Sequence, residues 1–96
     1  MAYTRLNPEY QSKGTYLEWK DYCTGDFNNI TASGIYYNAN QMTANKPVSG
    51  SMYGYVVVIA FNNQYTAQVA WNLGQLYWRA KYGAPASWSA WKTITA

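Results

Sequence analysis

The chain has 96 residues, contains a single cysteine, Cys23, and has no histidine. These counts fit one domain, and they exclude an intramolecular disulfide, a histidine-based catalytic triad and a histidine-containing metal site. The formal net charge of +3 is too weak and too scattered for a phosphate-binding stripe, which disfavours a nucleic-acid partner. Aromatic residues make up 19% of the chain, so their rings either fill a core or contact a partner.

The N-terminal part differs from the rest because it holds all four acidic residues, Glu9, Glu18, Asp21 and Asp26. It shows no apolar signal-peptide segment, and no stretch of the chain is long enough to insert into a membrane. Residues 16–22 alternate roughly between polar and apolar, which fits either a strand or a short helical turn. We predict a docking or linking segment over residues 1–24 and a β-rich knob domain over residues 25–96.

A short helical turn is predicted over residues 26–30. Asp26 offers a capping oxygen at its start, and Phe27 and Ile30, three residues apart, share an apolar face that can cover the end of a sheet. A turn at residues 33–34 then leads into a short strand over residues 35–37. The polar stretch over residues 38–50 reads as a long loop, a common place for function on a small scaffold.

The strongest strand signal is the apolar run over residues 53–61, which is rich in β-branched and aromatic side chains. Neither of its two faces is polar, so both faces need cover. We expect this strand at the centre of a small sheet, covered by loops, a second layer or another subunit.

Two alternating segments follow, and with the central strand they predict an antiparallel meander. In the first, Tyr65, Ala67, Val69 and Trp71 are expected to point inward, and Thr66, Gln68 and Asn72 outward. In the second, Leu76, Trp78, Ala80 and Tyr82 are expected inward, and Gln75, Tyr77, Arg79 and Lys81 outward. A turn and a last strand occupy residues 88–94. The fold class is therefore all-β: a small antiparallel sheet, meander or sandwich-like, with one short helical turn.

The residues needed for most kinds of catalysis are missing. All carboxylates lie in the irregular N-terminal part, and Cys23 has neither a histidine to activate it nor a second cysteine nearby. No glycine-rich phosphate loop occurs. We expect a protein that is not an enzyme, with no catalytic residues, no cofactor and no metal, and with Cys23 as a small buried apolar residue.

Several segments, taken in order, resemble the pyocin-knob-like C-terminal domain of bacteriophage tail fibres. Asp26–Tyr37 is similar to the turn and strand that open that domain, and Asn45–Gly50 is similar to its loop. Tyr53–Val58, Gln75–Arg79 and Trp88–Ile94 are similar to three of its later strands. The resemblance covers roughly residues 25–95.

This resemblance implies a homotrimeric knob in the virion of a phage, on a tail fibre, baseplate or capsid surface, made in the host cytoplasm. It implies attachment to a host cell-surface glycan, either a polysaccharide or a teichoic acid. Residues 1–24 match no part of the family and are expected to contact other virion proteins. The motif containing Trp88 and Trp91 recurs in the family, so these rings are expected to close the fold rather than to bind a ligand.

A glycan-binding surface needs rings for sugar faces and amides or arginine for hydroxyl groups. Two sets of residues are candidates: the loop set, Tyr36, Tyr37, Asn38, Asn40 and Gln41, and the outward strand set, Tyr77 and Arg79 with Lys81. For Tyr77 and Arg79, an exposed or intersubunit face of the sheet is favoured over a binding site.

Two other functions stay open. The first is a capsid or baseplate decoration subunit with a structural role and no receptor binding, which would bind another virion protein through residues 1–24. The second is a single-stranded nucleic-acid binder that stacks bases on exposed rings, which would lose affinity steeply with salt. The lack of a dense basic groove disfavours the second.

Overall fold

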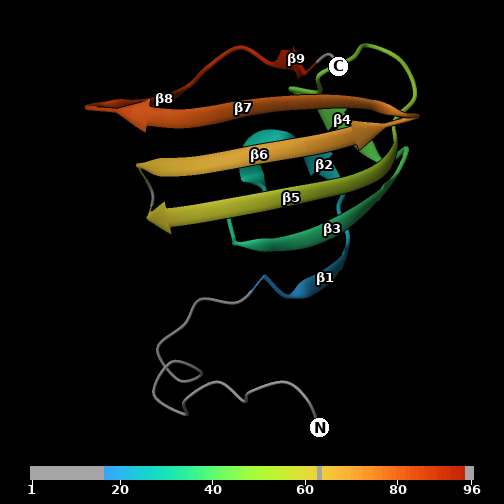
Figure 1. Cartoon of the computed structure of the whole chain (residues 1–96), viewed down its shortest axis with the longest axis horizontal. Helices are drawn as coiled ribbons and strands as arrows, with labels where there is room; N and C mark the ends of the chain where they lie inside the picture. Colours follow the sequence, from blue (N-terminus) through green and yellow to red (C-terminus); the bar gives the residue numbers. More distant parts are fainter. Residues whose placement is uncertain (1–16, 63, 95–96) are drawn as a thin grey trace, which may run out of the picture.

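The structure is a computed structural model that describes residues 17–62 and 64–94. One seven-stranded sheet dominates it (Figure 1). The strands, in their order across the sheet, are β1 (Trp19–Tyr22), β3 (Gly34–Ala39), β5 (Tyr53–Asn62), β6 (Tyr65–Asn72) and β7 (Gln75–Gly83), followed by β8 (Ala86–Trp88) and β9 (Lys92–Ile94), which both pair with β7. In the described part of the chain, no helix is long and apolar enough to cross a membrane.

The all-β class and the meander of β5, β6 and β7 are confirmed. Across β3, β5, β6 and β7, each strand is antiparallel to its neighbour, as predicted. Strand β1 is the exception, because it pairs parallel with β3. Parallel neighbours need a long crossover connection, and here the chain between β1 and β3 forms part of a second layer.

That second layer covers one face of the sheet. It contains the short parallel pair β2 (Gly25–Asp26) and β4 (Met42–Ala44), and the 3-10 turn η1 (Phe27–Asn29). The turn confirms the predicted helical element and its cap, because Asp26 Oδ1 accepts a hydrogen bond of 2.8 Å from the Asn28 amide. Phe27 and Met52, both fully buried, pack with Val56 and Val58 to form the core between the layers.

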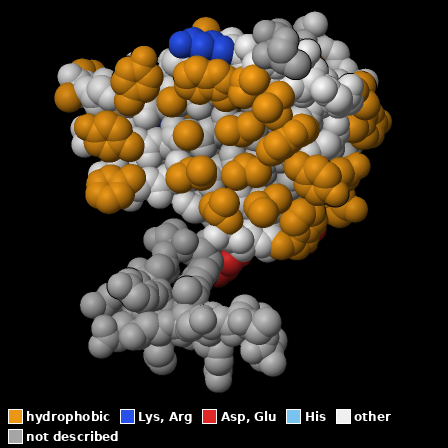
Figure 2. All heavy atoms as spheres, viewed as in Figure 1, with side chains coloured by type: hydrophobic (Ala, Val, Ile, Leu, Met, Phe, Trp, Pro, Cys, Tyr) orange, Lys and Arg blue, Asp and Glu red, His pale blue; other side chains and the backbone are white. Residues whose placement is uncertain are grey.

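The buried and exposed faces of the sheet are the reverse of those predicted. The face toward the second layer, called the inner face, carries Asn38, Thr66, Gln68, Asn72 and Arg79, all of which are buried. The other face, called the outer face, carries the apolar residues that were expected inside: Tyr65, Ala67, Val69, Trp71, Leu76, Trp78, Ala80 and Tyr82, together with Tyr55, Val57, Ile59 and Phe61. Figure 2 shows hydrophobic side chains spread across this face. The expected inward and outward sets of β6 and β7 are therefore wrong, although the alternation itself is correct.

Strand β1 lies within residues 1–24, which were expected to form a docking or linking segment. Trp19 pairs with Ile35 of β3, and its ring lies edge-to-face on Tyr55 at a centroid distance of 6.0 Å. The sheet therefore begins before residue 25. A docking role for the segment stays a prediction, and its first sixteen residues lie outside the described part.

Gly54 has no side chain and so allows β5 and β6 to lie close together. This position provides a test of the strand register. Its φ is 146°, and a Cβ at this position would overlap the carbonyl oxygen of Trp71. We expect Gly54→Ala to lower the free energy of unfolding by about 2 kcal/mol or more, through backbone strain and displacement of β6. Urea unfolding would measure the change.

Gly50→Ala is the matched control, because a Cβ at Gly50 has nothing within 4 Å. We expect this variant to unfold at nearly the wild-type urea concentration. Equal effects of the two substitutions would show that the close approach at Gly54 is not what constrains the strand.

Candidate functional site

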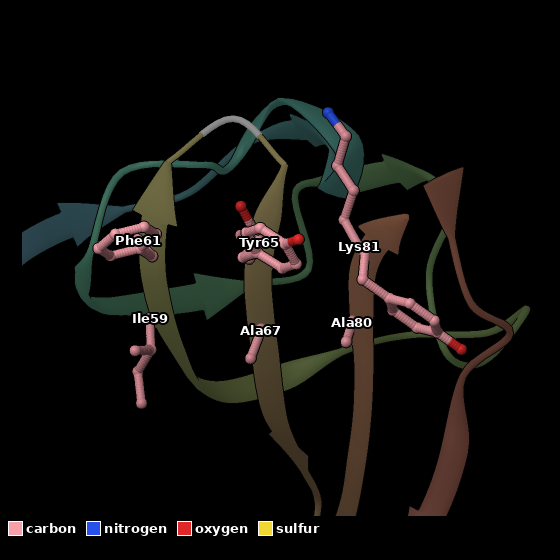
Figure 3. Close-up of a pocket in the computed structure, with 8 residues that line it drawn as sticks. Ile59, Phe61, Tyr65, Ala67, Ala80 and Lys81 are labelled. Carbon is pink, nitrogen blue, oxygen red and sulfur yellow. The ribbon is translucent and has the colours of Figure 1, made fainter. Parts of the chain in front are cut away.

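The outer face is the largest candidate surface for an interaction. One group of its exposed rings lies near the β5–β6 hairpin, where Phe61 is 84% exposed and Tyr65 and Tyr82 are also exposed. These three side chains, with Ile59, Ala67 and Ala80, line a shallow hollow of about 290 Å³ (Figure 3). In the figure the Phe61 and Tyr65 rings lie beside each other over neighbouring strands, whereas the ammonium group of Lys81 points away.

A second hollow, of about 330 Å³, lies on the same face between Ile35, Tyr55, Val57 and Trp71. Nearby, the rings of Tyr22, Tyr37 and Tyr55 form a chain of edge-to-face contacts, with centroid distances of 5.6 Å and 5.4 Å. Both hollows are lined almost entirely by apolar atoms. Sites for sugars and other polar ligands need convergent hydrogen-bonding groups, so this surface suits another apolar surface better than a glycan.

The inner face contains a connected set of buried polar groups. The Gln68 amide nitrogen donates to the carbonyl oxygens of Phe27 at 2.7 Å and Ile30 at 2.9 Å. Its oxygen accepts a bond of 2.8 Å from Arg79 Nε. Gln68 is therefore inside because it binds the irregular backbone of the second layer. Arg79 is inside because it binds Gln68 in turn.

Arg79 connects this network to the C-terminal segment. Its guanidinium carbon lies 3.9 Å from the ring centre of Trp88 and 4.8 Å from that of Trp91. Trp91 in turn packs edge-to-face on Phe27 at 5.2 Å and donates to the Asn45 carbonyl at 2.8 Å. Both tryptophans lie against the arginine, and Trp91 also packs against the core, in agreement with the expectation that they close the fold.

Asp26 and Arg79, on the inner side, both have lowered pKa values. Hydrogen bonds from the Asn45 side chain and the Asn28 amide lower the pKa of Asp26, and the nearby charge of Arg79 lowers it further. Burial lowers the pKa of Arg79 to about 10, so its guanidinium stays charged at neutral pH.

Cys23 is buried and free, as expected. Burial raises the pKa of its thiol to about 11, which makes it a poor nucleophile at neutral pH. Among residues 17–62 and 64–94, no three histidine, cysteine, aspartate or glutamate side chains cluster as a metal site would require.

The residues predicted to contact a glycan do not form one surface. Asn38 is fully buried and Arg79 is 3% exposed, so the outward orientation expected for Arg79 is wrong. Tyr36 lies on the inner face and packs against the core, with its hydroxyl donating to the Ala32 carbonyl at 2.7 Å. Tyr77 is half-buried on the same face.

The other three predicted contacts lie elsewhere. Tyr37 lies on the outer face among the tyrosine rings, whereas Asn40 and Gln41 are exposed in the turn between β3 and β4. Asn40 also holds the local fold, because its side-chain oxygen accepts from the Met52 amide at 3.0 Å. Sequence reasoning did not identify the outer face as a surface; the apolar character of both faces of residues 53–61 was the signal that pointed to it.

Comparison with known proteins found no matching family model and no matching curated protein. Among solved structures, the chain is similar to the R1 pyocin fibre of P. aeruginosa, in a structure comprising its C-terminal residues 323–701. The TM-score is 0.66 and the sequence identity 20%, over 91% of this chain and 24% of that chain. The chain thus spans about a quarter of the fibre structure that it matches. This likeness confirms the fold that the resemblance to fibre knobs predicted.

Arg79 provides a test of the buried polar network that Gln68 and Arg79 form on the inner face. Arg79→Lys keeps the charge but loses the Nε donor to Gln68 and the flat surface between two indole rings. We expect the free energy of unfolding to fall by about 2 kcal/mol, measured by urea unfolding. Near-ultraviolet circular dichroism would report the change in tryptophan packing.

The reverse exchange, Lys92→Arg, is the control, because Lys92 is exposed and lies over only the Trp78 ring. We expect its effect to stay within about 0.5 kcal/mol. If Arg79→Lys were equally harmless, the network would not hold the C-terminal segment in place.

Proposed function

We propose that this chain is a homotrimeric knob of a phage tail fibre or spike, located in the virion, that attaches the particle to a glycan on the host surface. The fold shared with a pyocin fibre supports a structural and binding role rather than a catalytic one. The observation that carries the proposal is the outer face, because a surface of this kind needs a permanent partner.

The area of the outer face supports self-association. Strands lie about 4.8 Å apart and extend about 3.4 Å per residue, so a sheet of this width and length presents on the order of 700 Å². Exposed apolar patches on monomers rarely exceed about 600 Å², whereas a standard interface buries about 800 Å² from each partner. Three copies sharing this face would bury the exposed rings and would present three weak glycan sites together, which raises avidity.

Val57 provides a test of the assembly. It lies near the centre of the outer face, paired with Ile35 and Val69 of the neighbouring strands. We expect Val57→Lys to dissociate the protein to single chains, because a buried unpaired charge is strongly unfavourable in an interface. Light scattering across a dilution series would measure the mass.

Thr43→Lys is the matched control, since Thr43 is exposed on β4 in the second layer. We expect this variant and the wild type to keep a mass three times that of the chain. A wild-type protein that is a monomer at every concentration would rule out the homotrimer and favour the structural decoration subunit, with a partner that binds residues 1–24.

The glycan contact is proposed at the turn between β3 and β4. Of the residues predicted from the sequence, Asn40 and Gln41 are exposed outside the outer face, and so remain accessible after assembly through that face. Gln41 contributes its backbone carbonyl to the fold by accepting from the Gly25 amide at 3.0 Å, which leaves its side chain available. A host polysaccharide or teichoic acid offers the hydroxyl groups that an amide can bind.

Gln41→Ala tests this site. Loss of one amide hydrogen bond costs about 1 kcal/mol, so we expect about fivefold weaker binding per site. Binding to purified wall polysaccharide and to teichoic acid, measured by biolayer interferometry, would show the loss. The control is Thr31→Ala, also at an exposed position. Glycan binding unaffected by Gln41→Ala would place the contact elsewhere, and binding to neither glycan would favour the structural role.

A further inference from the structure

The two margins of the sheet carry opposite charges. At one margin, Glu18 and Asp21 lie in or beside β1 and are both exposed. At the other margin, Lys92 is exposed on β9. The sequence has no acidic residue after Asp26, so nothing acidic surrounds Lys92 in its own segment. Figure 2 shows a basic side chain above the apolar surface and an acidic one below it.

These margin charges are only partly matched within the chain. The structure shows one ion pair in its described part, between Lys20 and Glu18 at 3.6 Å. The carboxylate of Asp21 accepts a hydrogen bond from the neighbouring Tyr22 amide and stays exposed. Lys92 lies 4.9 Å from the Trp78 ring centre, which places its ammonium group beside the outer face. Among the residues that the structure describes, the β1 margin is therefore net acidic by one charge, and the β9 margin is basic.

We propose that neighbouring copies of this chain meet with the acidic β1 margin of one against the basic β9 margin of the next. The inference depends on the proposed self-association of the outer face. Like margins brought together would place lysine near lysine and carboxylate near carboxylate, which costs free energy. Opposite margins, brought together by a threefold axis, give each copy the same two contacts and close the ring.

The arrangement also matches how stable interfaces are built. The apolar hollows and rings of the outer face would form the dry centre, and Glu18, Asp21 and Lys92 would form the charged rim. Rim charges contribute little to affinity, but they determine the orientation of the partner and exclude wrong pairings. The margins would thus fix the direction of the subunits around the axis, which an apolar face alone does not specify.

A charge exchange tests the contact. Lys92→Glu and Glu18→Lys would each place like charges together, and we expect each to raise the concentration at which the assembly dissociates by about tenfold. The double variant restores opposite charges and should return to nearly the wild-type value. Light scattering in dilution series at low salt gives these concentrations. If the double variant is no better than the single variants, the margin contact is overturned.

A cross-link provides a measurement that does not depend on charge. Glu18 and Lys92 lie at opposite edges of the sheet, separated by five strand spacings or roughly 24 Å, too far for a disulfide within one chain. We expect the variant Glu18→Cys with Lys92→Cys, oxidised with copper phenanthroline, to give linked species of up to three chains on a denaturing gel. Each single variant should stay unlinked, since Cys23 is buried. Dimers formed by a single variant would show that like margins meet, and would overturn the proposal.

These outcomes separate the inference from the proposed function. A trimeric wild type without rescue or cross-linking would leave the knob intact and remove only the margin contact. A dimeric wild type would overturn the homotrimer, and the cross-link would still decide which margins touch. A monomeric wild type would overturn both.

Discussion

The fold depends on the side-chain amide of Gln68. The second layer is mostly irregular, so its backbone carbonyls lack the partners that a ladder of strands would supply. Gln68 reaches from the middle of β6 to the carbonyls of Phe27 and Ile30, on both sides of the 3-10 turn. The Phe27 carbonyl also accepts from the Ile30 amide at 3.1 Å, so an apolar residue at this position would remove the Gln68 bond mainly from the Ile30 carbonyl. An unpaired buried carbonyl costs roughly 1–3 kcal/mol. This need explains why a glutamine occupies this position on the inner face.

Arg79 connects Gln68 to the C-terminal segment of the chain. A buried guanidinium is costly, but here it donates a hydrogen bond to Gln68 and lies over two indole rings. Aromatic faces stabilise a cation in places where water is excluded. The nearby charge of Asp26 favours the protonated arginine as well. Through these contacts the C-terminal segment, the polar loop and the 3-10 turn form one packed layer.

The sequence was sufficient to predict the class of fold, the 3-10 turn with its Asp26 cap, and the three strands of the meander. It could not predict which way the sheet faces, because alternation shows only which residues share a face. Polarity then misled the assignment: Gln68 and Arg79 look like surface residues until the carbonyls and rings that bind them are known. The candidate glycan residues were dispersed for the same reason, since Asn38 and Tyr36 follow the inner face and Tyr37 the outer one. The parallel pairing of β1 with β3 could not be predicted either, because the pattern of polar and apolar residues in a strand does not show which strand it pairs with.

The apolar outer face has a consequence for the newly synthesised chain. A subunit that has folded correctly still displays rings and edge strands that favour disordered aggregation at high concentration. Completing the fold therefore does not end this hazard, because the rings of the outer face are still exposed on a single folded chain.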